Sequence, residues 1–372
     1  MKRPDRLIAA TSHLAGEALD GLIAASNGLN NFLESNAVYV FSGVRPIGES
    51  AVVLDRDGAS TLIVTPAWDE ARAAAASSTD RTIGTDDLVA TLKSVVGTHR
   101  LDMSRTISVG LSLLGAALVD RIASALGALP QAADELARDL ARLRTPDELA
   151  TAERATWIAE RGYERLLEYA RPGIREFELA AELYCFMKKL GAEDNFLLMS
   201  ASQHNLAVRA AGERVLDVGD IILSELTPCY RGQFAQICRT TVIGEPRPVI
   251  REKFAILQEA MREGLVAGRA GATVADVTRA INAVIQKSGY GDYCRPPYMR
   301  VRGHGLGITS DRPGDIVDTN TRVLESGMVF VMHPNQYIPE SGYLMCGEPV
   351  VVTDDGARAL SARPAELDVI AV

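Results

Sequence analysis

The stretch that decides the fold runs from Gly219 to Thr240 and reads GDIILSELTPCYRGQFAQICRT. It has the pattern of a β-hairpin, and alternation along its second strand places Gln236 and Cys238 on one face, so the thiol should enter any site that the hairpin lines. Glu225 and Gln236 hold the two inward-facing positions where a divalent cation would need carboxylates. A neutral amide cannot offset cationic charge. The hairpin therefore predicts a polar site with little metal-binding charge.

Composition sets the broad class of the protein. The chain has 372 residues, which favours two or three domains, and its 47% hydrophobic and 23% charged residues are typical of a globular protein. The net charge of −9 makes a nucleic acid or an anionic membrane surface an unexpected partner. No stretch approaches the roughly 18 apolar residues of a membrane span. The five cysteines lack CxxC spacing, so we expect neither disulfides nor a structural zinc site, and a cytoplasmic location.

The first third of the chain predicts an α/β domain. We expect strands at 38–41, 51–54, 60–65 and 107–110, and a helix over 113–127. The run Thr145-Pro146-Asp147-Glu148 supplies an N-cap, a proline at the first helical position and a capping-box glutamate, which predicts a helix to about residue 170. We therefore place an amino-terminal domain over 1–143 and a second domain over 144–372.

The second domain contains a weak internal repeat. A glycine opens each of two helical patterns, at Gly173 and Gly271, and each pattern ends at a glycine the same distance on. A further alignment sets 219–225 against 327–333, so Glu225 and His333 take matching strand positions, and Cys238 then matches Cys346. Two related halves should each contribute one polar residue to a shared site.

These residues resemble the pita-bread fold family, which includes methionine aminopeptidase, aminopeptidase P, prolidase and creatinase. The matching landmarks, in order along the chain, are Gly219-Asp220, Arg239-Thr240, Gly303 to Gly307, Gly327-Met328 with Pro334, and 350–356. The resemblance implies an α+β chain of the creatinase and prolidase layout, with an amino-terminal α/β domain before a pita-bread domain that has an internal pseudo-twofold repeat.

The resemblance also implies where metal ligands would lie. Peptidases of this family bind two metals through two aspartates, a histidine and two glutamates, and those positions fall on Glu225, Gln236, His304, His333 and Gly347. Only the histidine is unchanged, which makes a two-metal mechanism an unexpected one. A substrate-facing histidine of the peptidases falls on Asp311, and another falls near 208–210, where His204 lies only a few residues upstream.

Creatinase is the family member that works without metal, and the hairpin shares its proline, at Pro228. We therefore predict a metal-independent, creatinase-like hydrolase that cleaves an amide or amidine C–N bond of a small carboxylate-bearing molecule, without a cofactor. His304 and His333 would transfer protons, Glu225 would act as base or orient an imidazole, and Cys238 is a candidate nucleophile. Creatine itself is a poor candidate, because a glutamate of creatinase falls on Cys238.

The remaining candidates are substrate-binding residues. Arg302 and Arg312 flank the site motifs and would hold a carboxylate, and Gln236, His204 and Tyr343 would contact substrate. The resemblance implies a homodimer whose partner closes the site, so the segment 44–50 with Arg45 would contribute across the interface.

Two other functions stay open. Glu225, His304 and His333 form a two-histidine, one-carboxylate set for a single metal, which would suit a mononuclear hydrolase or lyase, or an atypical Xaa-Pro aminopeptidase. Some pita-bread domains have instead become binding modules without catalysis.

Overall fold

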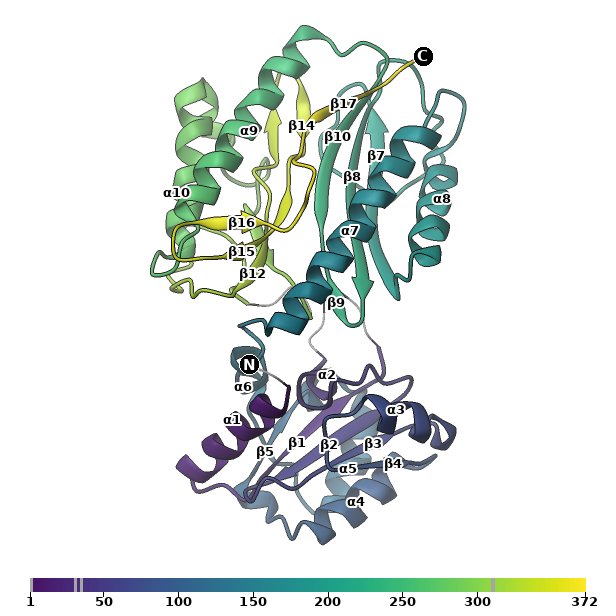
Figure 1. Cartoon of the computed structure of the whole chain (residues 1–372), viewed down its shortest axis with the longest axis vertical. Coiled ribbons are helices and arrows are strands. Elements are labelled where there is room, and N and C mark those ends of the chain that lie inside the picture. The colour runs from purple at the N-terminus through teal and green to yellow at the C-terminus, as the bar shows by residue number, and fades with distance from the viewer. Residues whose placement is uncertain (1–2, 30–31, 34–35, 309–311) are drawn as a thin grey trace. The chain divides into compact units, whose positions relative to one another are not determined.

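The computed structural model describes residues 3–29, 32–33, 36–308 and 312–372, so Asp311 lies outside the described residues. The chain divides into two compact units, Met1–Thr145 and Pro146–Val372. In each unit, helices cover β-sheet (Figure 1). The candidate residues of the hairpin all lie in the second unit.

The first unit is built on a six-stranded mixed sheet with the strand order β4-β3-β2-β1-β5-β6. Its strands are β1 (Gly21–Ser26), β2 (Ser50–Asp55), β3 (Ser60–Val64), β4 (Arg81–Gly84), β5 (Thr106–Val109) and β6 (Gln131–Ala132). Its helices of six or more residues are α1 (Arg3–Gly16), α2 (Ala37–Ser42), α3 (Glu70–Ala76), α4 (Leu88–Thr98), α5 (Ala116–Leu126) and α6 (Asp134–Leu140). The core packs Ile23, Val53 and Ile63 of the sheet against Leu92 of α4 and Ile122 of α5.

The expected strand at 38–41 is wrong, because these residues form helix α2. The Asn36 side chain accepts a hydrogen bond from the backbone N–H of Tyr39 at 3.0 Å, which caps the helix, and Gly43 ends it at φ 74°. All six residues of α2 are buried, so burial and capping prevail over the β propensity of Val38, Tyr39 and Val40. The expected strands at 51–54, 60–65 and 107–110 are confirmed as β2, β3 and β5.

The second unit contains four long helices and two main sheets. The helices are α7 (Pro146–Tyr169), α8 (Glu176–Lys189), α9 (Pro248–Ala267) and α10 (Val274–Ile285). One sheet holds β7 (Asp194–Ser202), β8 (Ile221–Tyr230), β9 (Gln233–Phe234), β10 (Ile237–Ile243) and β17 (Leu367–Ile370). The other holds β11 (Gly303–Gly305), β12 (Val329–Met332), β15 (Glu348–Val352) and β16 (Ala357–Ala359), with the hairpin β13 (Gln336–Ile338) and β14 (Gly342–Leu344) beside it in sequence.

The two halves of this unit repeat one arrangement. Helices α7 and α8 pack against the first sheet, α9 packs against the second, and α10 packs against α9 (Figure 1). The sheets join where the backbones of Cys238 and Gly347 exchange two hydrogen bonds of 3.0 Å. The predicted internal repeat is thus present, and its junction lies at the hairpin.

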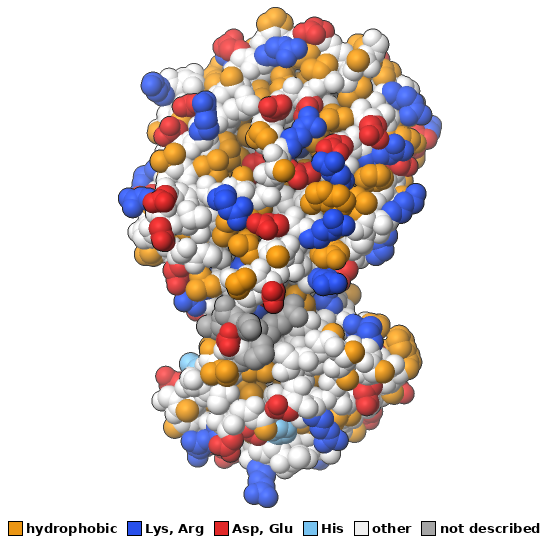
Figure 2. Space-filling view, viewed as in Figure 1, with side chains coloured by type: hydrophobic (Ala, Val, Ile, Leu, Met, Phe, Trp, Pro, Cys, Tyr) orange, Lys and Arg blue, Asp and Glu red, His pale blue; other side chains and the backbone are white. Residues whose placement is uncertain are grey.

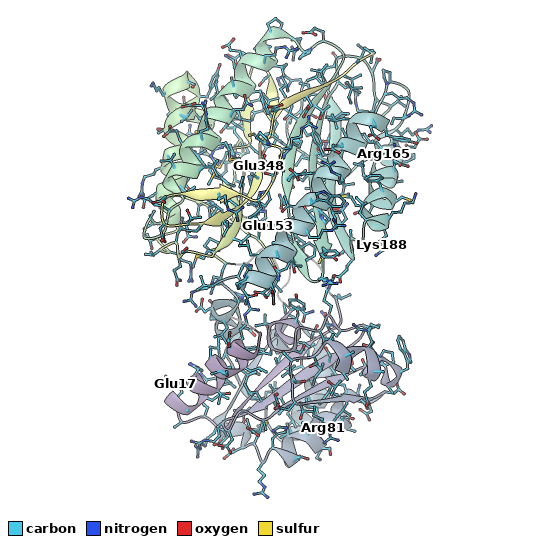
Figure 3. The ribbon with its side chains drawn as sticks, in the orientation of Figure 1. Glu17, Arg81, Glu153, Arg165, Lys188 and Glu348 are labelled. Carbon is cyan, nitrogen blue, oxygen red and sulfur yellow. The ribbon has the colours of Figure 1, made fainter. Side chains whose placement is uncertain are left out.

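The register at this junction corrects the expected match of Cys238 with Cys346. Cys238 lies opposite Glu225 in the first sheet, and Met332 lies opposite Glu348 in the second. Continuing that ladder by one residue sets His333 against Gly347, so Gly347 is the equivalent of Cys238. Because a shift of one residue reverses the face of a strand, Cys346 lies on the opposite face, with Glu348 at a separate cavity of about 420 Å³. Figure 3 shows Glu348 within the second unit.

The surface carries mixed charge. On the face of the second unit in view in Figure 2, Lys and Arg side chains are interspersed with Asp and Glu, and surface pairs such as Arg358 with Glu153 (3.1 Å) are common. On this face the charges do not gather into the basic patch that nucleic-acid binding needs. Within the described ranges, none of the helices has the length and apolar character that a bilayer span requires.

Candidate functional site

Five side chains meet beside the junction of the two sheets, and we call them the Cys238 cluster: Glu225, Gln236, Cys238, His333 and Tyr343. The Cys238 Sγ lies 3.9 Å from Glu225 Oε1 and 3.7 Å from Gln236 Nε2, so one sulfur contacts both polar residues of the hairpin. Gln236, Cys238 and His333 are buried, whereas Glu225 and Tyr343 keep some exposed surface. The predicted facing of Gln236 and Cys238 therefore brings them together with Glu225.

Burial controls the charge of the hairpin residues. It raises the pKa of Glu225 from 4.5 to about 7, partly opposed by the hydrogen bond from the Cys238 thiol. It also raises the pKa of Cys238 well above its ordinary value, and the neighbouring Glu225 adds to that effect. Cys238 is therefore a neutral thiol near pH 7, while a nucleophilic role needs the thiolate.

The two candidate histidines lie edge to face. Strand β11 places His304 opposite Val331, and the rings of His304 and His333 are 5.6 Å apart between centroids. Burial lowers the pKa of His304, and burial followed by the effect of His304 lowers the pKa of His333 to about 3. Both imidazoles are therefore neutral near pH 7. His304 Nδ1 lies 2.9 Å from the carbonyl oxygen of Gly305, a contact that can orient the ring.

Arg302 is engaged inside the protein. Its Nε donates to Asn282 Oδ1, its Nη1 to the Asn335 carbonyl oxygen and its Nη2 to Gln336 Oε1, each at 2.8 Å. The side chain has no exposed surface, and burial lowers its pKa to about 10. Arg302 therefore positions the residues after His333, and these contacts do not present it to a substrate carboxylate.

Asn335 and Gln336 were missed by the sequence analysis although they directly follow His333 and Pro334. Asn335 Oδ1 accepts a hydrogen bond from the Cys346 N–H at 2.9 Å, and the Asn335 side chain also lowers the pKa of Cys238 and of Tyr343 by hydrogen bonding. The dominant effect on Tyr343 is burial, which raises its pKa, with Glu225 next. The phenol is therefore a neutral hydrogen-bond donor near Glu225.

The other substrate-binding candidates lie outside the cluster. His204 is exposed, and its Nε2 lies 2.9 Å from the carbonyl oxygen of Pro339. Arg312 is half-buried beside residues that the structure does not describe. Arg45 belongs to the first unit, where its carbonyl oxygen accepts a hydrogen bond from Arg72 at 3.1 Å.

Comparison with known proteins defines the class. The family model described as metallopeptidase family M24 matches residues 150–354. The Xaa-Pro dipeptidase of Pyrococcus furiosus is 28% identical over 334 residues, covering 89% of this chain and 92% of that protein. The probable dipeptidase PepE of Mycobacterium tuberculosis is 30% identical over 254 residues, covering 68% and 67%. The chain belongs to metallopeptidase family M24.

Solved structures show the same fold over the full chain. A prolidase from Pyrococcus horikoshii OT3 has a TM-score of 0.84 at 22% identity, covering 98% of this chain and 99% of that one. An X-Pro aminopeptidase from Thermotoga maritima MSB8 has a TM-score of 0.84 at 23% identity, with the same coverage. The resemblance to the pita-bread family and the two-domain α+β fold are thereby confirmed.

These relatives correct the predicted activity. They are named as peptidases, whereas we expected a creatinase-like enzyme acting on a C–N bond outside peptides, so that prediction is wrong. The expectation of a metal-independent enzyme without a cofactor is also wrong, because the matching family is one of metallopeptidases. Sequence reasoning gave the substituted ligand positions more weight than the overall resemblance to prolidase.

The residues present do not fit a pair of metal ions. At one of the five ligand positions, a Cβ on Gly347 would lie 2.7 Å from Cys238 Cβ, 2.8 Å from its Sγ and 2.9 Å from His333 Cβ. A glutamate cannot occupy that space while Cys238 fills it. Across the described residues, no group of three His, Cys, Asp or Glu side chains is arranged to hold a metal ion. Glu225 also supplies the only carboxylate among the five ligand positions, too little charge for two divalent cations.

Replacing Gly347 with alanine should lower the free energy of unfolding by about 1–3 kcal/mol, because the added methyl overpacks the junction. Urea denaturation measures this loss. Gly97→Ala is the matched control, since nothing lies within 4 Å of its Cβ position, and it should cost nothing. Adding Cys238→Gly to Gly347→Ala removes two of the three clashing atoms, leaving His333 Cβ, and should recover part of the loss. Equal stability of Gly347→Ala and wild type would contradict this packing.

Proposed function

We propose that the chain hydrolyses the amide bond before proline in short Xaa-Pro peptides. The observation that carries this proposal is the convergence of Glu225 and His333 on one cluster, with His304 beside it, at ligand positions of a family whose named relatives include Xaa-Pro dipeptidases. One carboxyl, two neutral imidazoles and a phenol are groups that can move protons and donate hydrogen bonds around an amide.

Each group has a proposed role. Glu225 accepts a proton from the attacking water, whose oxygen bonds to the carbonyl carbon. The phenol of Tyr343 donates a hydrogen bond to the carbonyl oxygen as negative charge develops there. As the C–N bond breaks, the proline nitrogen takes up the proton that Glu225 received from water, and His304, whose ring lies 5.6 Å from that of His333 between centroids, would relay it. The products are a carboxylic acid and free proline. Cys238, as a neutral thiol, orients Glu225.

Release of free proline tests the proposal. Ala-Pro and Leu-Pro should be cleaved, and the reversed dipeptide Pro-Ala should not. The assay is run on the purified protein, on the chelated protein, and after adding Mn²⁺, Co²⁺ or Zn²⁺, with metal content measured in each sample. Absence of proline release from Xaa-Pro dipeptides in all of these samples would overturn the proposed function.

Two further properties are proposals of the same kind. A homodimer follows from the resemblance to prolidase and creatinase, and light scattering on the purified protein would give its mass. A cytoplasmic location agrees with the absence of disulfides among the five cysteines, all of which lie in the described ranges.

A further inference from the structure

The second unit contains a cavity of about 420 Å³ that is separate from the Cys238 cluster. The apolar part of its wall comes from helix α9 and from the chain at and after β16: Met261, Leu265, Ala359, Pro364 and Ala365. A mostly apolar wall with a few polar groups is typical of small-molecule sites, whose volumes are roughly 300–1,000 Å³. The proposed function leaves this cavity unused.

Glu348 lines the same cavity, and its two carboxylate oxygens have different partners. Oε2 accepts one hydrogen bond from Ser361 Oγ and another from Arg239 Nη2 at 3.3 Å. Oε1 lies 3.1 Å from Arg239 Nη2, but it has no hydrogen-bond partner of normal geometry among the described residues. Glu348 is only 3% exposed, so an unpaired oxygen on this side chain is costly and calls for an explanation.

The charges around the cavity are already balanced. Glu348 is paired with Arg239 inside the protein, and Arg262, which also lines the cavity, is paired with Glu259. Ser361 gives its single hydroxyl proton to Glu348, so both of these residues can only accept a further hydrogen bond. A charged ligand would therefore bring in a charge without a free partner, whereas a neutral hydrogen-bond donor would satisfy the carboxylate.

We propose that this cavity binds a neutral, mostly apolar molecule that carries one hydroxyl or N–H group, and that this group donates a hydrogen bond to Glu348. The apolar part of the molecule packs against Met261. Cys346 and Glu348 line the cavity, whereas Gly347 between them faces Cys238. The molecule therefore binds behind the Cys238 cluster, outside the space where a peptide would be cleaved, and the inference does not depend on the proposed function.

Arg239 connects this cavity to the junction of the two sheets. Its guanidinium pairs with Glu348 and donates to the carbonyl oxygens of Gly347 at 2.7 Å and Cys238 at 3.1 Å. A donor bound to the Glu348 carboxylate holds one end of this network in place. Because the cavity exists only in the folded chain, a ligand that occupies it should raise the free energy of unfolding.

Two probes of the same shape test the site on the wild-type protein. Indole is neutral and has one N–H donor, and benzofuran has an oxygen atom in place of that N–H. Titrations followed by NMR should give a Kd for indole about tenfold lower than that for benzofuran, in line with a hydrogen bond to a charged group. Indole should also shift the methyl resonance of Met261, assigned with Met261→Leu, and leave that of Met199 in β7 unchanged.

A variant that fills the cavity gives a second test. Ala359→Leu places a larger side chain in the wall, so it should weaken indole binding about tenfold or more and abolish the rise in unfolding free energy that indole causes. Ala255→Leu is the matched control, because Ala255 is exposed on α9 and does not line the cavity, and it should bind indole as wild type does.

Three results would overturn the inference: equal Kd values for indole and benzofuran, an unshifted Met261 resonance, or indole binding that Ala359→Leu leaves unchanged. If Ala359→Leu does not fold, the first two results on the wild-type protein decide. The proposed function stands or falls separately, because these measurements involve no peptide cleavage. Loss of proline release in all samples would therefore leave the cavity site intact, and equal binding of the two probes would leave the peptidase function intact.

Discussion

Replacing Arg239 with methionine should lower the free energy of unfolding by about 3–5 kcal/mol, because it leaves the Glu348 carboxylate buried without its cation. Both side chains are almost fully buried, and Arg239 Nη2 lies 3.1 Å from Glu348 Oε1. The same guanidinium donates to the carbonyl oxygens of Gly347 at 2.7 Å and Cys238 at 3.1 Å. The variant therefore loses an ion pair and two hydrogen bonds at the point where the sheets join.

Urea denaturation at pH 7 measures this effect, with Arg251→Met as the control. Arg251 makes an ion pair of 3.0 Å with Glu245 on the surface, and its loss should cost only about 0–1 kcal/mol. The double variant Arg239→Met with Glu348→Leu removes both charges and should recover much of the loss. A cost below about 1 kcal/mol for Arg239→Met would show that the pair is not the support of this junction.

Arg239 also fixes the backbone beside the Cys238 cluster. Its hydrogen bonds go to the carbonyl groups of Cys238 and Gly347, the two residues that connect the half-sheets and border the Cys238 cluster. Loss of these bonds should therefore reduce proline release as well as stability. In the double variant, stability should return more fully than activity, since hydrophobic replacements restore packing but not these two hydrogen bonds.

The parts of the fold that the sequence predicted are those set by local signals. The Thr145-Pro146 start placed helix α7, and strand alternation placed Gln236 and Cys238 on one face. Strand β1 was missed, because its six buried residues lack alternation. Helix α2 was mistaken for a strand, because its cap depends on the single side chain of Asn36.

The parts of the site that could not be predicted depend on contacts between distant segments. Gly347 faces Cys238 only because β15 joins β10 at one register, and a register error of one residue had pointed to Cys346. Arg302 was expected to hold substrate, but its partners Asn282 and Gln336 lie 20 and 34 residues away along the chain. No local pattern in the sequence reports such partners.

Replacing Glu225 with glutamine should lower kcat/KM for Ala-Pro by about 10²–10⁴, because the amide cannot accept a proton from water. The substitution keeps the size of the side chain, so the fold should be retained. Glu225→Asp keeps the carboxyl and shortens the side chain, and it should retain more activity than Glu225→Gln. Activity of Glu225→Gln within a few-fold of wild type would remove Glu225 from its proposed role.

Glu225→Gln should be more stable than wild type at high pH. This gain in stability distinguishes it from a variant that has lost activity because it is unfolded. The pKa of Glu225 is raised from 4.5 to about 7 by folding, so the native state holds this proton more tightly and loses stability as pH rises through that range. Above pH 7 the loss amounts to up to about 3 kcal/mol, which Glu225→Gln avoids. His333 acts in the opposite sense in both proteins: its pKa is lowered from 6.5 to about 3, so stability falls as pH falls below 6.5. The difference in unfolding free energy between wild type and Glu225→Gln should therefore be near zero below pH 4.5 and largest above pH 7. A difference that does not change with pH would show that folding leaves the pKa of Glu225 unshifted.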